Sequence, residues 1–205
     1  MTGEIVARVV RALERYYQAS AEDPRPFVAV HEDDGGRELL LVREGEEDLE
    51  LKLVLPRRLA TVPPQGWQTL TLDDRCQVVE GASHFLMVCE RARADRSTTH
   101  LELELQAEVD KWLVLSNGGR LDRDADLELR DALFPIARAS REGEFLHPAN
   151  TVEGERYRLA NNLAARFVHK LSTTFVRAGR HDDLRAELSK FFRMTQEEKL
   201  RAVAA

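Results

Sequence analysis

The chain has 205 residues and a mass of 23.3 kDa, and its 43% of hydrophobic residues are enough for the core of a globular protein. Thirty basic and 36 acidic residues give a formal net charge of −6, which excludes a chain that is basic throughout but not a basic patch on one face. Cys76 and Cys89 are the only two cysteines, which excludes a scaffold held together by disulfides.

No targeting segment is evident in the sequence. The first residues lack the basic end, apolar run and cleavage site of a secretory signal, and no run approaches the roughly 18 apolar residues of a membrane-spanning helix. We therefore expect a cytoplasmic protein with no membrane partner. The 25 arginines against 5 lysines are typical of a GC-rich genome, and we expect a bacterial source.

The first third of the chain combines one helical pattern with three strand patterns. Apolar side chains recur at helical spacing over residues 4–19, and the prolines that follow end this helix because they lack a backbone N–H. Residues 27–31, 38–43 and 49–55 are rich in strand-forming residues, and the last run has a leucine at every second position. Asp34-Gly35-Gly36 is a turn signal between the first two. We predict an N-terminal helix and a three-stranded antiparallel meander.

The remainder is predicted to be a mainly helical portion of about five helices, which makes the fold class α+β. Residues 97–106 are ambiguous, because alternating leucine and glutamate indicate a strand while a longer window has helical spacing that favours a helix. Prolines around position 63 mark a boundary, so we expect residues 1–62 and 63–205 to be two portions packed as one compact unit. The expected helices lie near 73–94, 97–115, 124–134, 150–178 and 182–193, with a short one after the capping box Thr195–Glu198.

Charge is unevenly distributed along the chain. Residues 141–205 contain 12 basic and 9 acidic residues, and residues 154–193 contain nine basic and four. Such asymmetry is typical of a basic face for nucleic acid, of a contact between two parts of one protein, or of solvated helix faces. No zinc-finger spacing, helix-turn-helix glycine turn or aromatic RNA-binding pattern accompanies the basic segment. We therefore favour a contact between two parts of one protein or solvated helix faces over a nucleic-acid surface.

Two residues are candidates for catalysis. Glu108 falls near the centre of the apolar face of the predicted helix 97–115, where a carboxylate is costly to ionise without a partner. This position is consistent with a buried general acid. We favour the alternative, a structural glutamate paired with one of the arginines. His84 lies off the apolar stripe of its helix, and a lone histidine is more often packed or hydrogen-bonded than a ligand.

Metal and nucleophile chemistry have little support in the sequence. His84, His100, Glu104 and Glu108 could meet at a metal only through long-range folding, since no two of them have the Glu-x-x-His or His-x-x-x-His spacing that places ligands on one helix face. Cys89 lies on an apolar stripe, where a thiol stays protonated. The sequence contains no nucleophile elbow and no glycine-rich phosphate loop. We expect neither a metal nor a cofactor.

The pattern most typical of a binding site is His147 and Asn150, which lead into the helix that carries Arg158, Asn162 and His169. The last three lie on one helix face, opposite the apolar stripe. A polar loop at a helix N-terminus beside basic and amide side chains is suited to an anion or a carboxylate. The alternative, which we favour, is the solvated side of an amphipathic helix.

The order of helix, meander and helix over about the first third of the chain is similar to that of class I type III secretion chaperones, which are small, acidic and dimeric. No specific motif carries this likeness, and the helical remainder departs from it, so it does not establish a family.

The sequence leaves three functions open. The leading hypothesis is a non-catalytic binding, adaptor or regulatory protein that acts through protein–protein contacts, with a protein partner or as a homodimer. The first alternative is a small-ligand-binding protein or an enzyme with an anion site on the loop and helix at 147–169. The second is nucleic-acid binding through the basic segment 154–193.

Overall fold

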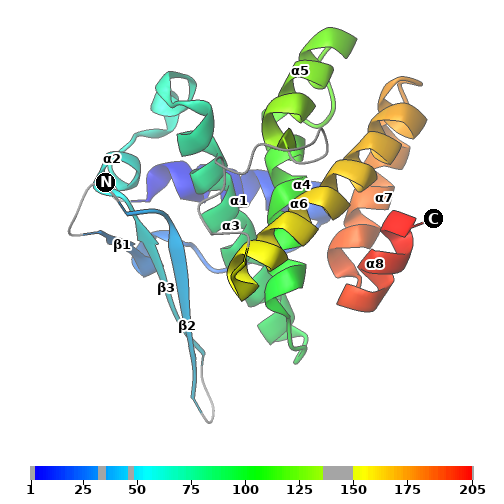
Figure 1. The fold of residues 1–205 in the computed structure, drawn as a ribbon. Coiled ribbons are helices and arrows are strands. Elements are labelled where there is room, and N and C mark those ends of the chain that lie inside the picture. Colours follow the sequence, from blue (N-terminus) through cyan, green and yellow to red (C-terminus); the bar gives the residue numbers. More distant parts are fainter. Residues whose placement is uncertain (1–2, 32–35, 46–48, 136–149, 205) are drawn as a thin grey trace. The chain divides into compact units, whose positions relative to one another are not determined.

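The computed structural model describes residues 3–31, 36–45, 49–135 and 150–204 (Figure 1). His147, which is predicted to be a site residue, lies outside the described residues. The chain divides into two compact units, Met1–Ser97 and Thr98–Ala205, called unit 1 and unit 2 below and described separately. No helix among the described residues has the length and apolar character that crossing a membrane requires.

Unit 1 is a small sheet with helices against it. The helix α3 packs against β2 and β3, and α1 packs against α3 (Figure 1). The segment after β3, where the prolines predicted an irregular boundary, contains a short helix and a 3₁₀ turn. The elements are α1 (Glu4–Tyr17), the 3₁₀ turn η1 (Arg25–Phe27), β1 (Val28–Val30), β2 (Leu39–Glu44), β3 (Leu49–Leu55), α2 (Arg57–Ala60), η2 (Pro64–Thr69) and α3 (Leu72–Arg93).

The prediction of an antiparallel meander is wrong in one respect. The strand order is β1-β3-β2, with β2 antiparallel to β3 but β1 parallel to it. The longest strand, β3, takes the centre, where its residues Leu53 and Leu55 are fully buried. The eight residues between β1 and β2 are too many for a tight hairpin, and this length lets the chain pass the end of β3. The α+β character of the chain is as predicted.

The helix α3 lies close against the strand β3 in unit 1. A Cβ atom at Gly81 of α3 would lie 3.0 Å from Cδ1 of Leu53 in β3, so a glycine allows the helix backbone to approach the sheet. The paired residues of the sheet show that Leu40 and Val42 share this helix-covered face with Leu51 and Leu53.

Unit 2 is helical throughout its described residues. The ambiguous segment is a helix, since α4 begins at His100 after a complete capping box formed by Thr99 and Glu102. Buried Leu105, Val109 and Trp112 lie on its inner face. The elements are α4 (His100–Leu115), α5 (Arg123–Leu133), α6 (Val152–Leu171), a π-helical turn (Ser172–Val176), α7 (His181–Arg193) and α8 (Gln196–Ala204).

Several helices begin with a side-chain cap, among them the predicted capping box at Thr195. The Thr71 side chain accepts from the backbone N–H of Asp74 at the start of α3, and Thr195 and Glu198 bond reciprocally at the start of α8. The N-cap of α6 is Thr151, one residue after Asn150. The Thr151 side chain accepts from Gly154 N–H at 3.0 Å, because this threonine is one position nearer to the first turn of α6.

Candidate functional site

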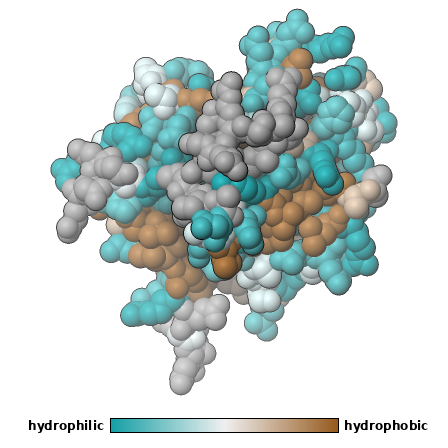
Figure 2. All heavy atoms as spheres, viewed as in Figure 1, coloured by the Kyte–Doolittle hydropathy of each residue, from teal (hydrophilic) through white to brown (hydrophobic). Residues whose placement is uncertain are grey.

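Apolar side chains are exposed along β2 of unit 1. Leu39 is 49% exposed, Leu41 46% and Val42 45%, and these three residues are called the β2 patch. Figure 2 shows brown, apolar atoms gathered over the strands of unit 1. Single exposed apolar residues are ordinary on a protein surface, but three within four positions of an outer strand indicate a contact surface. Leu39 and Leu41 lie on one face of the sheet and Val42 on the other, so the patch wraps around the strand.

A hollow of about 490 Å³ lies beside the β2 patch. It is lined by residues 26–29 around the start of β1, residues 41–43 of β2 and residues 50–52 of β3. Its position follows from the short first strand: β1 pairs only with Leu53–Leu55, so the first half of β3 is paired with β2 alone among the described strands. This flank of β3 offers backbone groups and apolar side chains to an extended segment.

The rim of the hollow is charged. Arg43 and Glu50 form an exposed ion pair across β2 and β3, with 2.5 Å between nitrogen and oxygen, and Lys52 is exposed nearby. The hydrogen bond to the Glu50 carboxylate raises the pKa of Arg43 above its ordinary value, at which the guanidinium is already charged. An apolar floor with a charged rim is the usual anatomy of a protein-binding surface.

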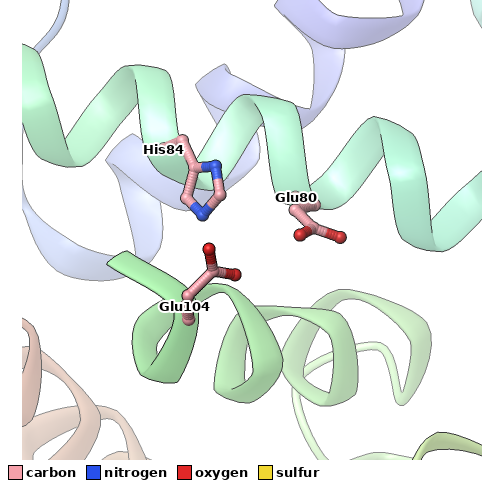
Figure 3. A group of neighbouring side chains, drawn as sticks. All are labelled: Glu80, His84 and Glu104. Carbon is pink, nitrogen blue, oxygen red and sulfur yellow. The ribbon is translucent and has the colours of Figure 1, made fainter. Parts of the chain in front are cut away.

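His84 projects from α3 together with a residue that the sequence analysis missed. Glu80 lies one helical turn before it, and a carboxylate oxygen of Glu80 is within 4.8 Å of a ring nitrogen of His84. Figure 3 shows both side chains on the same side of α3; Glu104, also labelled there, belongs to α4 of unit 2. The Glu-x-x-x-His spacing was the sequence signal that could have found this pair. Two such donors supply half of the four ligands of a typical metal site.

Glu108 is buried in unit 2 and has partners. Its carboxylate accepts from Lys111 Nζ at 2.6 Å and from Asn161 Nδ2 at 2.8 Å. The hypothesis of a structural glutamate named an arginine as the partner, whereas the cation is Lys111, one helical turn away on the same helix. This residue links α4 to α6 through Asn161, which also donates to the backbone oxygen of Leu133 at 3.0 Å. Such paired burial is typical of a structural carboxylate.

The other residues of the anticipated anion site are spread along α6. Asn150 is exposed in the turn before the helix, Arg158 and Asn162 are half-buried, and His169 is exposed. His169 has a partner from another helix, because Nη1 of Arg130 in α5 lies 3.3 Å from its Nδ1. A guanidinium can only donate, so Nδ1 is the acceptor in this contact.

Asp126 is a further buried residue that the sequence analysis did not single out. Its carboxylate accepts from Trp112 Nε1 at 2.8 Å, Arg130 Nε at 3.0 Å and Ser172 Oγ at 2.8 Å. These donors come from α4, α5 and the π-helical turn after α6. No local pattern could have found the cluster, since its members are up to 60 positions apart and meet only in the folded unit.

No known protein family, curated protein or solved structure matches this chain.

Proposed function

We propose that this chain is a non-catalytic binding protein that acts through protein–protein contacts at the sheet of unit 1. The observation that carries the proposal is the exposed β2 patch beside the hollow of about 490 Å³. Burying the exposed half of one leucine contributes on the order of 1 kcal/mol, so a partner that covers the patch and fills the hollow gains several such increments.

The chemistry of the hollow favours an extended polypeptide segment. The flank of β3 to which no other described strand pairs supports main-chain hydrogen bonds. The apolar floor at Leu51 selects apolar side chains at alternate positions. The Arg43–Glu50 pair and Lys52 at the rim then favour polar or charged residues between them.

The test is a display library of short random peptides selected against the full chain, followed by affinity measurement for the selected peptides. We expect sequences with alternating apolar residues, and we expect Leu51→Asp to weaken their binding at least tenfold because it places a charge in the hollow. Leu51→Ser is the milder second variant, and circular dichroism checks that both variants fold.

The matched control is Leu127→Asp, which changes a 43% exposed leucine on α5 of unit 2. This variant should bind the selected peptides within twofold of the unchanged chain. The proposal is wrong if no peptide is enriched, or if folded Leu51 variants bind the selected peptides as tightly as the unchanged chain does.

A further inference from the structure

The helix α8 is anchored on unit 2 by a charged side chain. The preceding helix α7 buries four apolar side chains, whereas Lys199 is the one buried residue of α8, every residue of which the structure describes. Lys199 is 0% exposed, while the apolar residues Leu200 and Val203 are only half-buried. Amphipathic helices usually dock through an apolar stripe, and burying an ammonium is costly unless it is paired.

The ammonium of Lys199 lies in a site made of buried groups from α4 and α7. Its Nζ donates to Oε1 of Gln106 at 2.5 Å and lies 4.6 Å from the centre of the Phe191 ring. Gln106 is held in this orientation, because its Nε2 donates to Oδ1 of Asp110 at 2.9 Å. An amide oxygen and an aromatic face both attract an ammonium, so the site is suited to this one group.

The Gln106 amide connects two buried charges of opposite sign. Asp110 is 0% exposed and accepts from one end of the amide, and Lys199 donates to the other end. Removing one member of a buried, hydrogen-bonded charge pair is costly, because the remaining charge stays desolvated. Without the ammonium, Gln106 loses this donor and Asp110 loses the positive charge beyond it. The docking of α8 therefore depends on the charge of Lys199.

We infer that α8 is a strap that opens as a unit, and that the charge of Lys199 closes it. The inference concerns unit 2 and does not depend on the proposed function of the sheet in unit 1. Elements with few buried apolar contacts open locally before the rest of a fold. A helix of nine residues is too short to be stable alone in water, so an undocked α8 also loses its helical hydrogen bonds.

Two further hydrogen bonds align α8 in its closed position. Thr99 Oγ1 donates to Gln196 Oε1 at 2.6 Å, and Lys170 Nζ donates to the backbone oxygen of Ala202 at 3.3 Å. The first is exposed and the second is partly buried, so water replaces both at little cost when the strap opens. Opening uncovers the site around Gln106, and α8 thereby controls access to an ammonium-binding site that the chain's own lysine fills.

Hydrogen exchange of the full chain, followed by NMR, tests the opening. The hydrogen-bonded amides of α8 should share one protection factor, about tenfold or more below that of the amides in α4 and α6. Fraying from one end of the helix would instead give protection that falls residue by residue. Protection equal to that of α4 would show that α8 opens only when unit 2 unfolds. Either of these results overturns the strap.

Lys199→Met tests the closing charge, because methionine keeps an unbranched side chain but carries no ammonium. This variant should lower the protection of the α8 amides by a further factor of about ten or more and leave α4 and α6 unchanged. The matched control Lys190→Met removes an exposed lysine of α7 and should leave α8 within about twofold of the unchanged chain. Unchanged protection of α8 in Lys199→Met, or an equal loss throughout unit 2, overturns the inference.

Chemical rescue separates charge from shape. Lys199→Ala lacks the part of the lysine side chain that n-propylammonium supplies, so adding this cation should restore the protection of α8 in the variant and saturate with concentration. The neutral n-propanol has a similar size and should not restore it at the same concentration and ionic strength. Rescue by n-propanol as well, or by neither compound, overturns the role of the charge. If Lys199→Ala does not fold, the exchange of the unchanged chain and of Lys199→Met decides the inference.

Discussion

At the scale of single residues, Asp126 joins three segments of unit 2 through its carboxylate. Its donors Trp112, Arg130 and Ser172 are all buried, so removing the carboxylate leaves a guanidinium, an indole N–H and a hydroxyl without their acceptor. Breaking a buried charge pair costs more than the pair contributes in net terms, because the remaining charge is desolvated and uncompensated.

We expect Asp126→Ala to lower the free energy of unfolding by about 3–5 kcal/mol. Asp124→Ala is the control, since Asp124 is exposed in the first turn of the same helix and its loss costs about 1 kcal/mol or less. Chemical denaturation followed by circular dichroism measures both. Equal destabilisation by the two variants would show that the buried contacts of Asp126 contribute nothing.

The two cysteines should differ in reactivity. Cys89 is buried, and burial raises the pKa of its thiol above the ordinary value, the direction that favours the protonated thiol. Burial and a smaller share of thiolate should make Cys89 react with iodoacetamide more slowly than the half-buried Cys76. The labelling rate of Cys89 should keep rising as the pH becomes more alkaline. Mass spectrometry of time points between neutral and alkaline pH measures both rates, with Cys76→Ser as the control; faster labelling of Cys89 at neutral pH would contradict the expectation.

At the scale of elements, Gly119 controls how the turn after α4 meets the π-helical turn after α6 and the start of α7. Its φ is +71°, and a Cβ there would lie 2.9 Å from Cγ2 of Val176 and 3.0 Å from Cδ2 of Leu184. Gly179 also has a positive φ, of +65°, but a Cβ there would meet no atom within 4 Å. An alanine at either glycine has the same unfavourable backbone conformation, but only the alanine at Gly119 also overlaps neighbouring atoms. Comparing the two variants therefore separates the cost of backbone strain from the cost of steric overlap.

Gly119→Ala should destabilise the chain by about 1–3 kcal/mol more than Gly179→Ala, because only the former adds overpacking to the shared backbone cost. Thermal and chemical unfolding of the two variants measure the difference. If the two variants lose the same free energy of unfolding, the side chains around Gly119 can rearrange at no cost in stability, and the expectation is wrong.

At the scale of the whole molecule, the two units contain one tryptophan each, Trp67 in unit 1 and Trp112 in unit 2. Each tryptophan therefore reports on its own unit when the other is replaced by phenylalanine. Since each unit has its own core, we expect the two units to unfold in separable transitions.

The test combines these reporters with a destabilised unit 2. In the Trp67→Phe background, Gly119→Ala should lower the denaturant midpoint reported by Trp112 fluorescence. In the Trp112→Phe background, the same substitution should leave the Trp67 midpoint where it was. A joint shift of both midpoints would instead show one cooperative structure, as the sequence analysis expected of its two portions.

Features that depend on near neighbours were predictable from local patterns. The leucines at every second position of residues 49–55 predicted β3, and the capping box Thr195–Glu198 predicted the start of the last helix, because strand pleating and helix caps involve residues only a few positions apart. The parallel pairing of β1, the Asn161 partner of Glu108 and the cluster around Asp126 became visible only in the folded chain. Those contacts depend on which distant segments meet in space, and local patterns do not encode that when several segments compete for the same place.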